Sequence, residues 1–275
     1  MRGIGKQWIA AVVLAGWMGC AASAVITEGV LSGESRISGR FGPGDMSTVL
    51  KKFSQGLDRP LLLGVDAGSA PVAVMQLADW LRAQRPLLDV DDACTGSCAW
   101  LLVSTGRGLD VRRGAFIAFD TASALQLFEV VRQRIEAGEL FTDASASAAS
   151  RQRLQDKVKA IFADAHAYDL QVRKLWPAPM LAFVEALRGP LNKPELVFDD
   201  ERVNIAFDGD RPRCLWWVPD AQGLRQIGLD LPGFQPPPRE RLAKQLNVNA
   251  AQIYVGPMLE AQPAQGLCAQ AKEMK

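Results

Sequence analysis

The feature that constrains the fold most is the alternation of short apolar runs with apolar segments of helical spacing between residues 60 and 120. The run PLLLGVDAG (60–68) ends in turn residues, which is typical of a strand buried on both faces. The segment PVAVMQLADWLRAQ (71–84) places apolar residues three and four apart, as an amphipathic helix does. A strand, an apolar helix and another strand follow in LLDVDDA (87–93), SCAWLLVSTG (97–106) and AFIAFD (115–120). This order predicts an α/β fold of stacked β-α units with a mostly parallel sheet.

The chain on either side of this alternation predicts further elements. Before it, alternating residues predict one strand over Val25–Ile37. Asp45 or Ser47 can cap a helix over Ser47–Gln55. After it, residues 124–187 have a helical composition that is broken several times, which predicts two or three helices.

From residue 191 onward the sequence becomes rich in strand-forming residues. Four strands are predicted, in ELVF (195–198), RVNIAF (202–207), CLWWV (214–218) and QIGLDL (226–231). A helix over Arg239–Leu246 and a strand over Ala251–Val255 follow. We therefore expect an α/β core with a helical segment over residues 25–190 and a β-rich C-terminal region over residues 191–275.

The first 24 residues have the order of a secretory signal peptide. Arg2 and Lys6 precede an apolar run over residues 8–18, and small residues end the stretch at 22–24. The apolar run is shorter than the about 20 residues that a membrane-spanning helix needs. We expect cleavage after Ala24 and a periplasmic or secreted protein; the alternative is a lipoprotein anchored through Cys20.

The charge of the exported chain excludes some partners. The whole chain has 31 Lys and Arg against 30 Asp and Glu, a net charge of +1. Arg2 and Lys6 leave with the signal peptide, so the remainder is close to neutral. No basic field remains that would hold nucleic acid or an anionic membrane surface, so we expect neither as a partner.

Four cysteines stay in the exported chain, and an even number in an oxidising compartment favours disulfides. Three pairings are formally open; we predict Cys94 with Cys98 and Cys214 with Cys268. The alternative is a metal site. One histidine in the chain and no Cys-x-x-Cys spacing leave few ligands of the usual kind, so we expect no metal and no cofactor.

The segments ISGRFGPGD, LLLGVDAGSAPVAVMQLADWLRAQ, CTGSCAWLLVSTG and GAFIAFD together resemble the Clp peptidase and crotonase superfamily. More narrowly, they are similar to secreted Clp-like periplasmic proteins of Gram-negative bacteria. The resemblance covers residues 37–121 and implies a spiral of β-α units. It places Gly68 and Ser69 in the oxyanion loop, Ser97 at the nucleophile and Gly106 in the turn after its helix.

The resemblance also places Asp120 where the peptidases carry their catalytic histidine. A serine needs a nearby base to lose its proton. The only histidine, His166, lies far along the chain, and no lysine occurs between Lys52 and Lys157. The site is therefore interpreted as degenerate.

Each candidate residue has a structural alternative. Ser97 can be a nucleophile or the cap of its helix. Cys94 and Cys98 can be a redox pair or, since their spacing is Cys-x3-Cys, a staple on the turn that carries Ser97. Asp120 can act as an acid or base or cap the next helix, and His166 can pair with a neighbouring carboxylate.

The tryptophans Trp216 and Trp217 are adjacent on a predicted strand, with Phe198, Phe207 and Tyr254 nearby in sequence. Adjacent strand residues point to opposite faces, so one tryptophan is expected in the core and the other is free to meet a partner.

These observations favour a non-catalytic binding or interaction module that meets an unidentified periplasmic protein and can form a homo-oligomer. The alternative is a serine hydrolase, a peptidase, that uses Ser97 with backbone N–H groups near Gly68 and an atypical base, Asp120 or His166.

Overall fold

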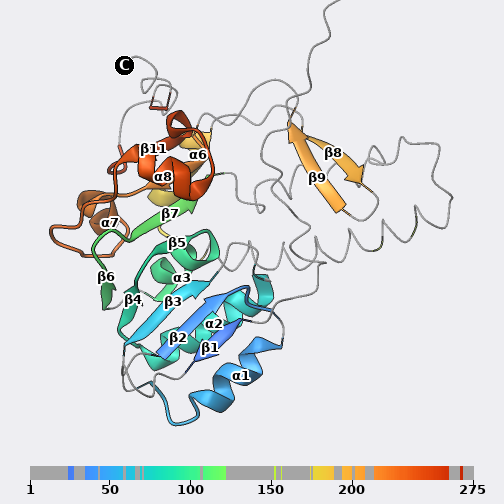
Figure 1. Ribbon diagram of the computed structural model, residues 1–275, viewed down its shortest axis with the longest axis vertical. Helices are drawn as coiled ribbons and strands as arrows, with labels where there is room; N and C mark the ends of the chain where they lie inside the picture. The colour runs from blue at the N-terminus through green and yellow to red at the C-terminus, as the bar shows by residue number, and fades with distance from the viewer. Residues whose placement is uncertain are drawn as a thin grey trace, which may run out of the picture.

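In the described part of the computed structural model the strands form two larger sheets and a separate two-stranded hairpin. Helix α3 (Ser97–Thr105) packs between the two larger sheets (Figure 1). The structure describes residues 24–27, 35–42, 44–57, 60–65, 69, 71–105, 108–121, 176–188, 194–199, 202–207, 214–259 and 267–268, and the single residues 152, 156 and 174.

The first sheet has five strands in the order β1-β2-β3-β4-β6. Its strands are β1 (Val25–Thr27), β2 (Ser35–Gly39), β3 (Leu61–Val65), β4 (Leu88–Val90) and β6 (Leu109–Val111). β1 runs antiparallel to β2, whereas β2, β3, β4 and β6 are parallel to one another. The predicted α/β fold with a mostly parallel sheet is therefore confirmed.

The second sheet joins the middle of the chain to its C-terminal part. Its order is β11-β10-β7-β5, with β5 (Ala93–Thr95), β7 (Phe116–Asp120), β10 (Trp216–Val218) and β11 (Ile253–Val255). β5 is parallel to β7, and β10 is antiparallel to β7 and parallel to β11. The C-terminal strands thus complete a sheet that β5 and β7 begin.

Two consecutive stretches of chain follow the same path. β4 lies in the first sheet, and after Asp91 and Asp92 the chain enters the second sheet as β5. β6 and β7 repeat this step one strand further along, with Leu109 opposite Leu88 in the first sheet and Phe116 opposite Ala93 in the second. These two stretches therefore form a unit that occurs twice and contributes one strand to each sheet.

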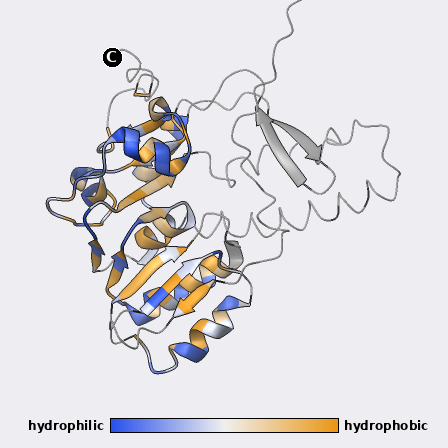
Figure 2. Ribbon diagram, in the orientation of Figure 1, coloured by the Kyte–Doolittle hydropathy of each residue, from blue (hydrophilic) through white to orange (hydrophobic). Residues whose placement is uncertain are grey.

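The helices cover these sheets. They are α1 (Asp45–Lys52), α2 (Pro71–Gln84), α3, α6 (Ala178–Arg188), α7 (Ala221–Gln226) and α8 (Arg239–Leu246). α3 is buried over Cys98–Leu102 and contacts β3 of the first sheet and β5 and β7 of the second. It can be covered by both sheets because its buried residues are apolar on every side of the helix. α8 is more hydrophilic and lies at the surface (Figure 2).

Aromatic side chains fill the core of the second sheet. Trp100 meets Phe119 edge to face, with ring centroids 4.9 Å apart. Phe119 in turn contacts Trp217 at 5.3 Å, and Phe183 of α6 contacts both Trp217 and Tyr254. Such contacts each add about 0.5–1.5 kcal/mol beyond the burial of area. They bind α3 and α6 to the same face of the sheet.

Several predicted elements are confirmed, and others differ. The helix Arg239–Leu246 has the predicted bounds. The strands predicted over residues 195–198 and 202–207 form an antiparallel hairpin, β8 (Pro194–Asp199) with β9 (Arg202–Phe207). The stretch 226–231 is not a strand, because α7 takes its first residue and turn residues follow.

The N-terminal prediction is wrong in two respects. Val25–Ile37 is not one strand: β1 and the start of β2 are separate strands that pair antiparallel. Neither Asp45 nor Ser47 caps α1, because Gly44 precedes the helix and Asp45 is its first residue. The Asp45 carboxylate instead accepts hydrogen bonds from the N–H groups of Gly42, at 2.7 Å, and Ala24, at 3.3 Å.

Candidate functional site

Ser97 stands where β5 turns into α3. Gly96 joins them with φ of +54°, a left-handed conformation that favours glycine. The Gly96 carbonyl accepts the first helical hydrogen bond, from Trp100 N–H at 3.1 Å, so Gly96 is the cap and Ser97 is the first helical residue. The structure therefore does not support the alternative in which Ser97 caps α3. Its side chain is half-buried, and its Oγ makes no hydrogen bond to any described residue.

Asp120 ends β7, the strand parallel to β5, so both residues lie at the carboxyl ends of neighbouring strands. Its Oδ1 accepts a hydrogen bond from Trp100 Nε1 at 3.1 Å. Burial raises the pKa of Asp120, while the hydrogen bonds from Trp100 and from the backbone lower it in part. The carboxyl group is thus held by the helix that carries Ser97, through a residue one turn further along.

Trp100 is a residue that the sequence reasoning missed. It follows Ser97 by three positions, and residues at that spacing lie on the same side of a helix, so the spacing could have revealed it. Its ring stacks on Trp176, with centroids 3.2 Å apart and planes inclined by 15°. Trp176 is buried, and its Nε1 finds no hydrogen-bond acceptor in the described chain. Asp120 therefore contacts Trp100, one of two stacked tryptophans.

The remaining predicted site residues are spread more widely. Ser69 is buried, and its Oγ accepts a hydrogen bond from the Phe41 N–H at 2.9 Å, which ties the segment after β2 to the segment after β3. Gly68, Gly106, Cys20 and His166 lie outside the described residues.

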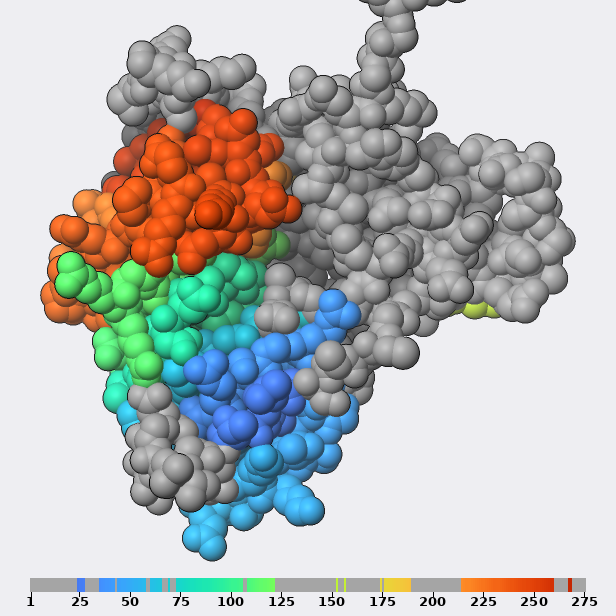
Figure 3. Space-filling model, viewed as in Figure 1, coloured from blue at the N-terminus to red at the C-terminus, as the bar shows by residue number. Residues whose placement is uncertain are grey.

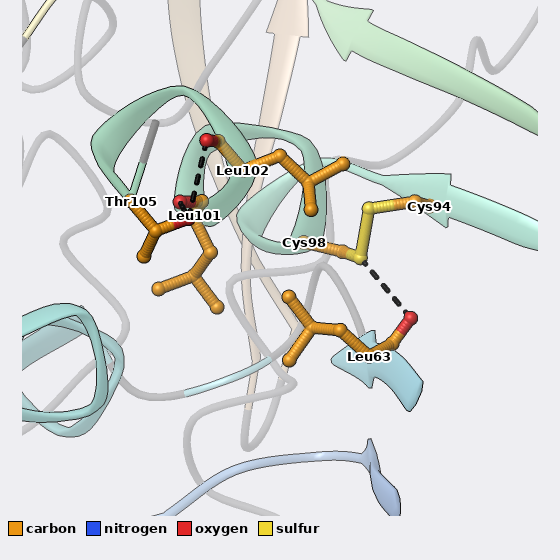
Figure 4. Close-up of a disulfide and its surroundings, with 6 residues drawn as sticks. All are labelled: Leu63, Cys94, Cys98, Leu101, Leu102 and Thr105. Atoms are coloured by element: carbon orange, nitrogen blue, oxygen red, sulfur yellow. Dashed lines mark hydrogen bonds between the residues drawn. A yellow bond between two sulfur atoms is a disulfide. The ribbon is translucent and has the colours of Figure 1, made fainter. Parts of the chain in front are cut away.

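Both predicted disulfides are confirmed: Cys94–Cys98 and Cys214–Cys268. Cys94 is on β5 and Cys98 in the first turn of α3, so the bond encloses Gly96 and Ser97. Figure 4 shows Cys98 beside β3, with its Sγ 3.7 Å from the Leu63 carbonyl oxygen. Both cysteines are fully buried, so their sulfur atoms are not accessible to an external thiol. This burial favours the structural staple over the redox pair.

The tryptophans of β10 point to opposite faces, as predicted. Trp217 is fully buried and its Nε1 donates to the Gly256 carbonyl at 2.9 Å. Trp216 is half-buried and packs on the other face with Leu242 and Ile253. Tyr254 belongs to the aromatic core, so neither it nor Trp217 is available as a partner surface.

Metal-ligand clusters and membrane-spanning helices are both missing from the part of the chain that the structure describes. No three His, Cys, Asp or Glu residues there form a group that could hold a metal ion. No helix there is long and apolar enough to cross a membrane. Comparison of the chain with family models, with curated proteins and with solved structures gives no match.

Proposed function

We propose that this protein is an exported, non-catalytic binding module built on a degenerate serine site. The observation that carries the proposal is the pairing of Asp120 with Trp100 rather than with Ser97. A general base must lie within about 2.6–3.2 Å of the hydroxyl group that it activates. Among the described residues no side chain makes that contact with Ser97 Oγ.

The repeated path of the chain supports a Clp/crotonase-like architecture. β4–β5 and β6–β7 each contribute one strand to each sheet, and α3 returns the chain from β5 to β6. A spiral of β-α units would have this connectivity. The two disulfides support an oxidising compartment, for which we propose the periplasm.

A serine hydrolase is the second candidate. It is favoured by the strand–glycine–serine–helix junction at Gly96 and Ser97, which presents a hydroxyl group at a helix N-terminus. The N–H groups and dipole of such a terminus stabilise developing negative charge. In this case the second carboxylate oxygen of Asp120, or His166, would have to reach the Ser97 hydroxyl group to act as the base.

A fluorophosphonate probe separates the two candidates. We expect no labelling of the oxidised protein, because no described side chain is placed to act as a base on Ser97. Labelling is measured by intact mass, with an active serine hydrolase in the same reaction as a control for the probe. Labelling of the wild type that is lost in Ser97→Ala would overturn the binding proposal and establish the hydrolase.

A further inference from the structure

The outer edge of β6 is an unpaired strand edge in the described chain. Among the described strands, β6 is the last strand of the first sheet and pairs with β4 alone. Leu88 N–H donates to the Gly108 carbonyl at 2.7 Å, and Arg112 N–H donates to the Val90 carbonyl at 2.9 Å. In a parallel ladder the bonded residues alternate, so the N–H and C=O groups of Leu109 and Val111 point away from β4.

The amino end of this edge is apolar. Leu109 and Val111 are half-buried, and Leu87 is 46% exposed. A Cβ atom on Gly108 would lie 3.0 Å from Leu87 Cδ1, so the Leu87 side chain covers the start of β6. An extended segment laid along β6 would therefore meet apolar side chains as well as unpaired backbone groups.

The carboxyl end of the edge is cationic. Arg113 and Gly114 form a tight turn after β6, closed by a hydrogen bond from Ala115 N–H to the Arg112 carbonyl at 2.9 Å. Gly114 has φ of +87°, as the third residue of a type II turn requires. Both guanidinium nitrogens of Arg241, on α8, lie 3.5 Å from the Cβ position of Gly114. Arg241 therefore reaches the turn that exposes Arg113.

These two arginines have no carboxylate partner among the described residues. Arg112 pairs with Asp89 at 3.7 Å, whereas neither Arg113 nor Arg241 forms an ion pair with a described carboxylate. Asp110, the acidic residue of β6, alternates to the opposite face from Leu109 and Val111. Guanidinium groups favour carboxylates because their planar donors can bind both oxygens.

We propose that the β6 edge binds an extended acidic segment of a partner protein by β-strand addition. The segment pairs with the outward groups of Leu109 and Val111, places apolar side chains near Leu87, and places a carboxylate between Arg113 and Arg241. Main-chain hydrogen bonds supply affinity in this mode, and side chains supply specificity. Figure 3 shows that the green segment containing β6 reaches the surface. This inference rests on the proposed binding function and names its partner class.

The test uses the oxidised full chain to select from a displayed library of linear dodecapeptides. We expect the enriched peptides to combine strand-forming residues with Asp or Glu. Binding of one enriched peptide is then measured by fluorescence polarisation. Val111→Pro removes one outward N–H but no ladder bond, and we expect it to weaken binding about tenfold. The control Val111→Thr keeps the N–H and should bind within about twofold of the wild type.

A second variant tests whether the two arginines contribute to peptide binding. Arg113→Gln combined with Arg241→Gln should weaken binding about tenfold and remove most of its salt dependence. Circular dichroism of each variant confirms that it is folded.

Three results would overturn the proposal. They are the absence of enriched peptides, enrichment without acidic residues, and binding unchanged by Val111→Pro. Self-association that Val111→Pro abolishes would assign the edge to a second copy of this chain instead. These outcomes are distinguishable from failure of the proposed function, which shows as fluorophosphonate labelling of Ser97.

Discussion

At the scale of single residues, Asp120 is where burial and hydrogen bonding oppose each other. Burial disfavours its carboxylate form and raises the pKa, whereas the indole N–H of Trp100 favours that form. Because burial dominates, the folded protein binds the proton of Asp120 more tightly than the unfolded chain does. Asp120 therefore makes the free energy of unfolding depend on pH.

Ionisation of Asp120 should lower the free energy of unfolding as pH rises. In the unfolded chain Asp120 titrates near the ordinary value of about 3.9, and in the folded protein it titrates higher. The unfolding free energy should fall as pH rises through the window between these two values. Asp120→Asn cannot ionise and can still accept from Trp100, so it should be more stable than the wild type at neutral pH. Urea unfolding from pH 3 to 7 should show this advantage shrinking as pH falls through that window, with no further change below about pH 4.

A second variant tests the opposing hydrogen bond. Trp100→Phe keeps an aromatic ring but removes the N–H that favours the carboxylate. The variant should lose stability from its altered core and also show a steeper fall with pH than the wild type. Parallel pH profiles for the wild type, Asp120→Asn and Trp100→Phe would contradict the assigned cause.

At the scale of elements, α7 depends on close backbone contact with the segment after β11. Asp220 caps α7 by accepting from the Gly223 N–H at 2.8 Å. Gly223 is buried, and a Cβ atom there would lie 2.9 Å from Pro219 Cβ and 3.0 Å from the Gly256 carbonyl oxygen. Only glycine fits at this contact without a shift of the backbone.

Gly223→Ala should therefore destabilise the protein although alanine is the better helix former. Overpacking costs about 1–3 kcal/mol, which exceeds the about 0.5–1 kcal/mol that alanine gains within a helix. Gly44→Ala is the matched control, since no atom lies within 4 Å of its Cβ position. It should change the unfolding free energy by less than about 0.5 kcal/mol in urea unfolding. Equal changes in unfolding free energy for the two substitutions would show that the backbone around Gly223 shifts to accommodate the added Cβ atom without cost.

At the scale of the whole molecule, the two disulfides connect very different lengths of chain. Cys94 and Cys98 are four positions apart, whereas Cys214 and Cys268 are separated by 54. Cys214 precedes β10, and its carbonyl accepts from the Thr121 hydroxyl just after β7. The longer disulfide thus ties the C-terminal part of the chain to the second sheet.

The stability lost on removing each disulfide should increase with the length of the loop that the disulfide closes. In the chain-entropy account, the Cys214→Ala, Cys268→Ala pair should lose about 4 kcal/mol and the Cys94→Ala, Cys98→Ala pair about 2 kcal/mol. Urea unfolding without reductant measures both losses. A larger loss for the shorter loop would mean that the Cys94–Cys98 bond acts mainly by holding the native turn at Ser97.

Much of the fold was predictable because its signals are local. The apolar run 61–65 and the helices over 71–84 and 239–246 follow from periodicity and burial, which neighbouring residues encode. Two disulfides were expected from the even number of cysteines, and the pairing that was chosen among the three open ones is confirmed. The strand over 226–231 failed because a short apolar stretch does not distinguish a strand from the end of a helix.

The sequence by itself determined the α/β class, the even number of cysteines after residue 24 and the absence of a histidine from the strand over residues 115–120. The structure selected the pairing of Cys94 with Cys98 around Ser97. Only the tertiary structure decided that Trp100 holds Asp120, that β10 and β11 complete the sheet of β7, and that β6 ends a sheet beside Arg241. Each of these contacts joins residues distant in the chain or depends on the direction of a side chain. No local pattern encodes them, because they are set by how the whole core packs.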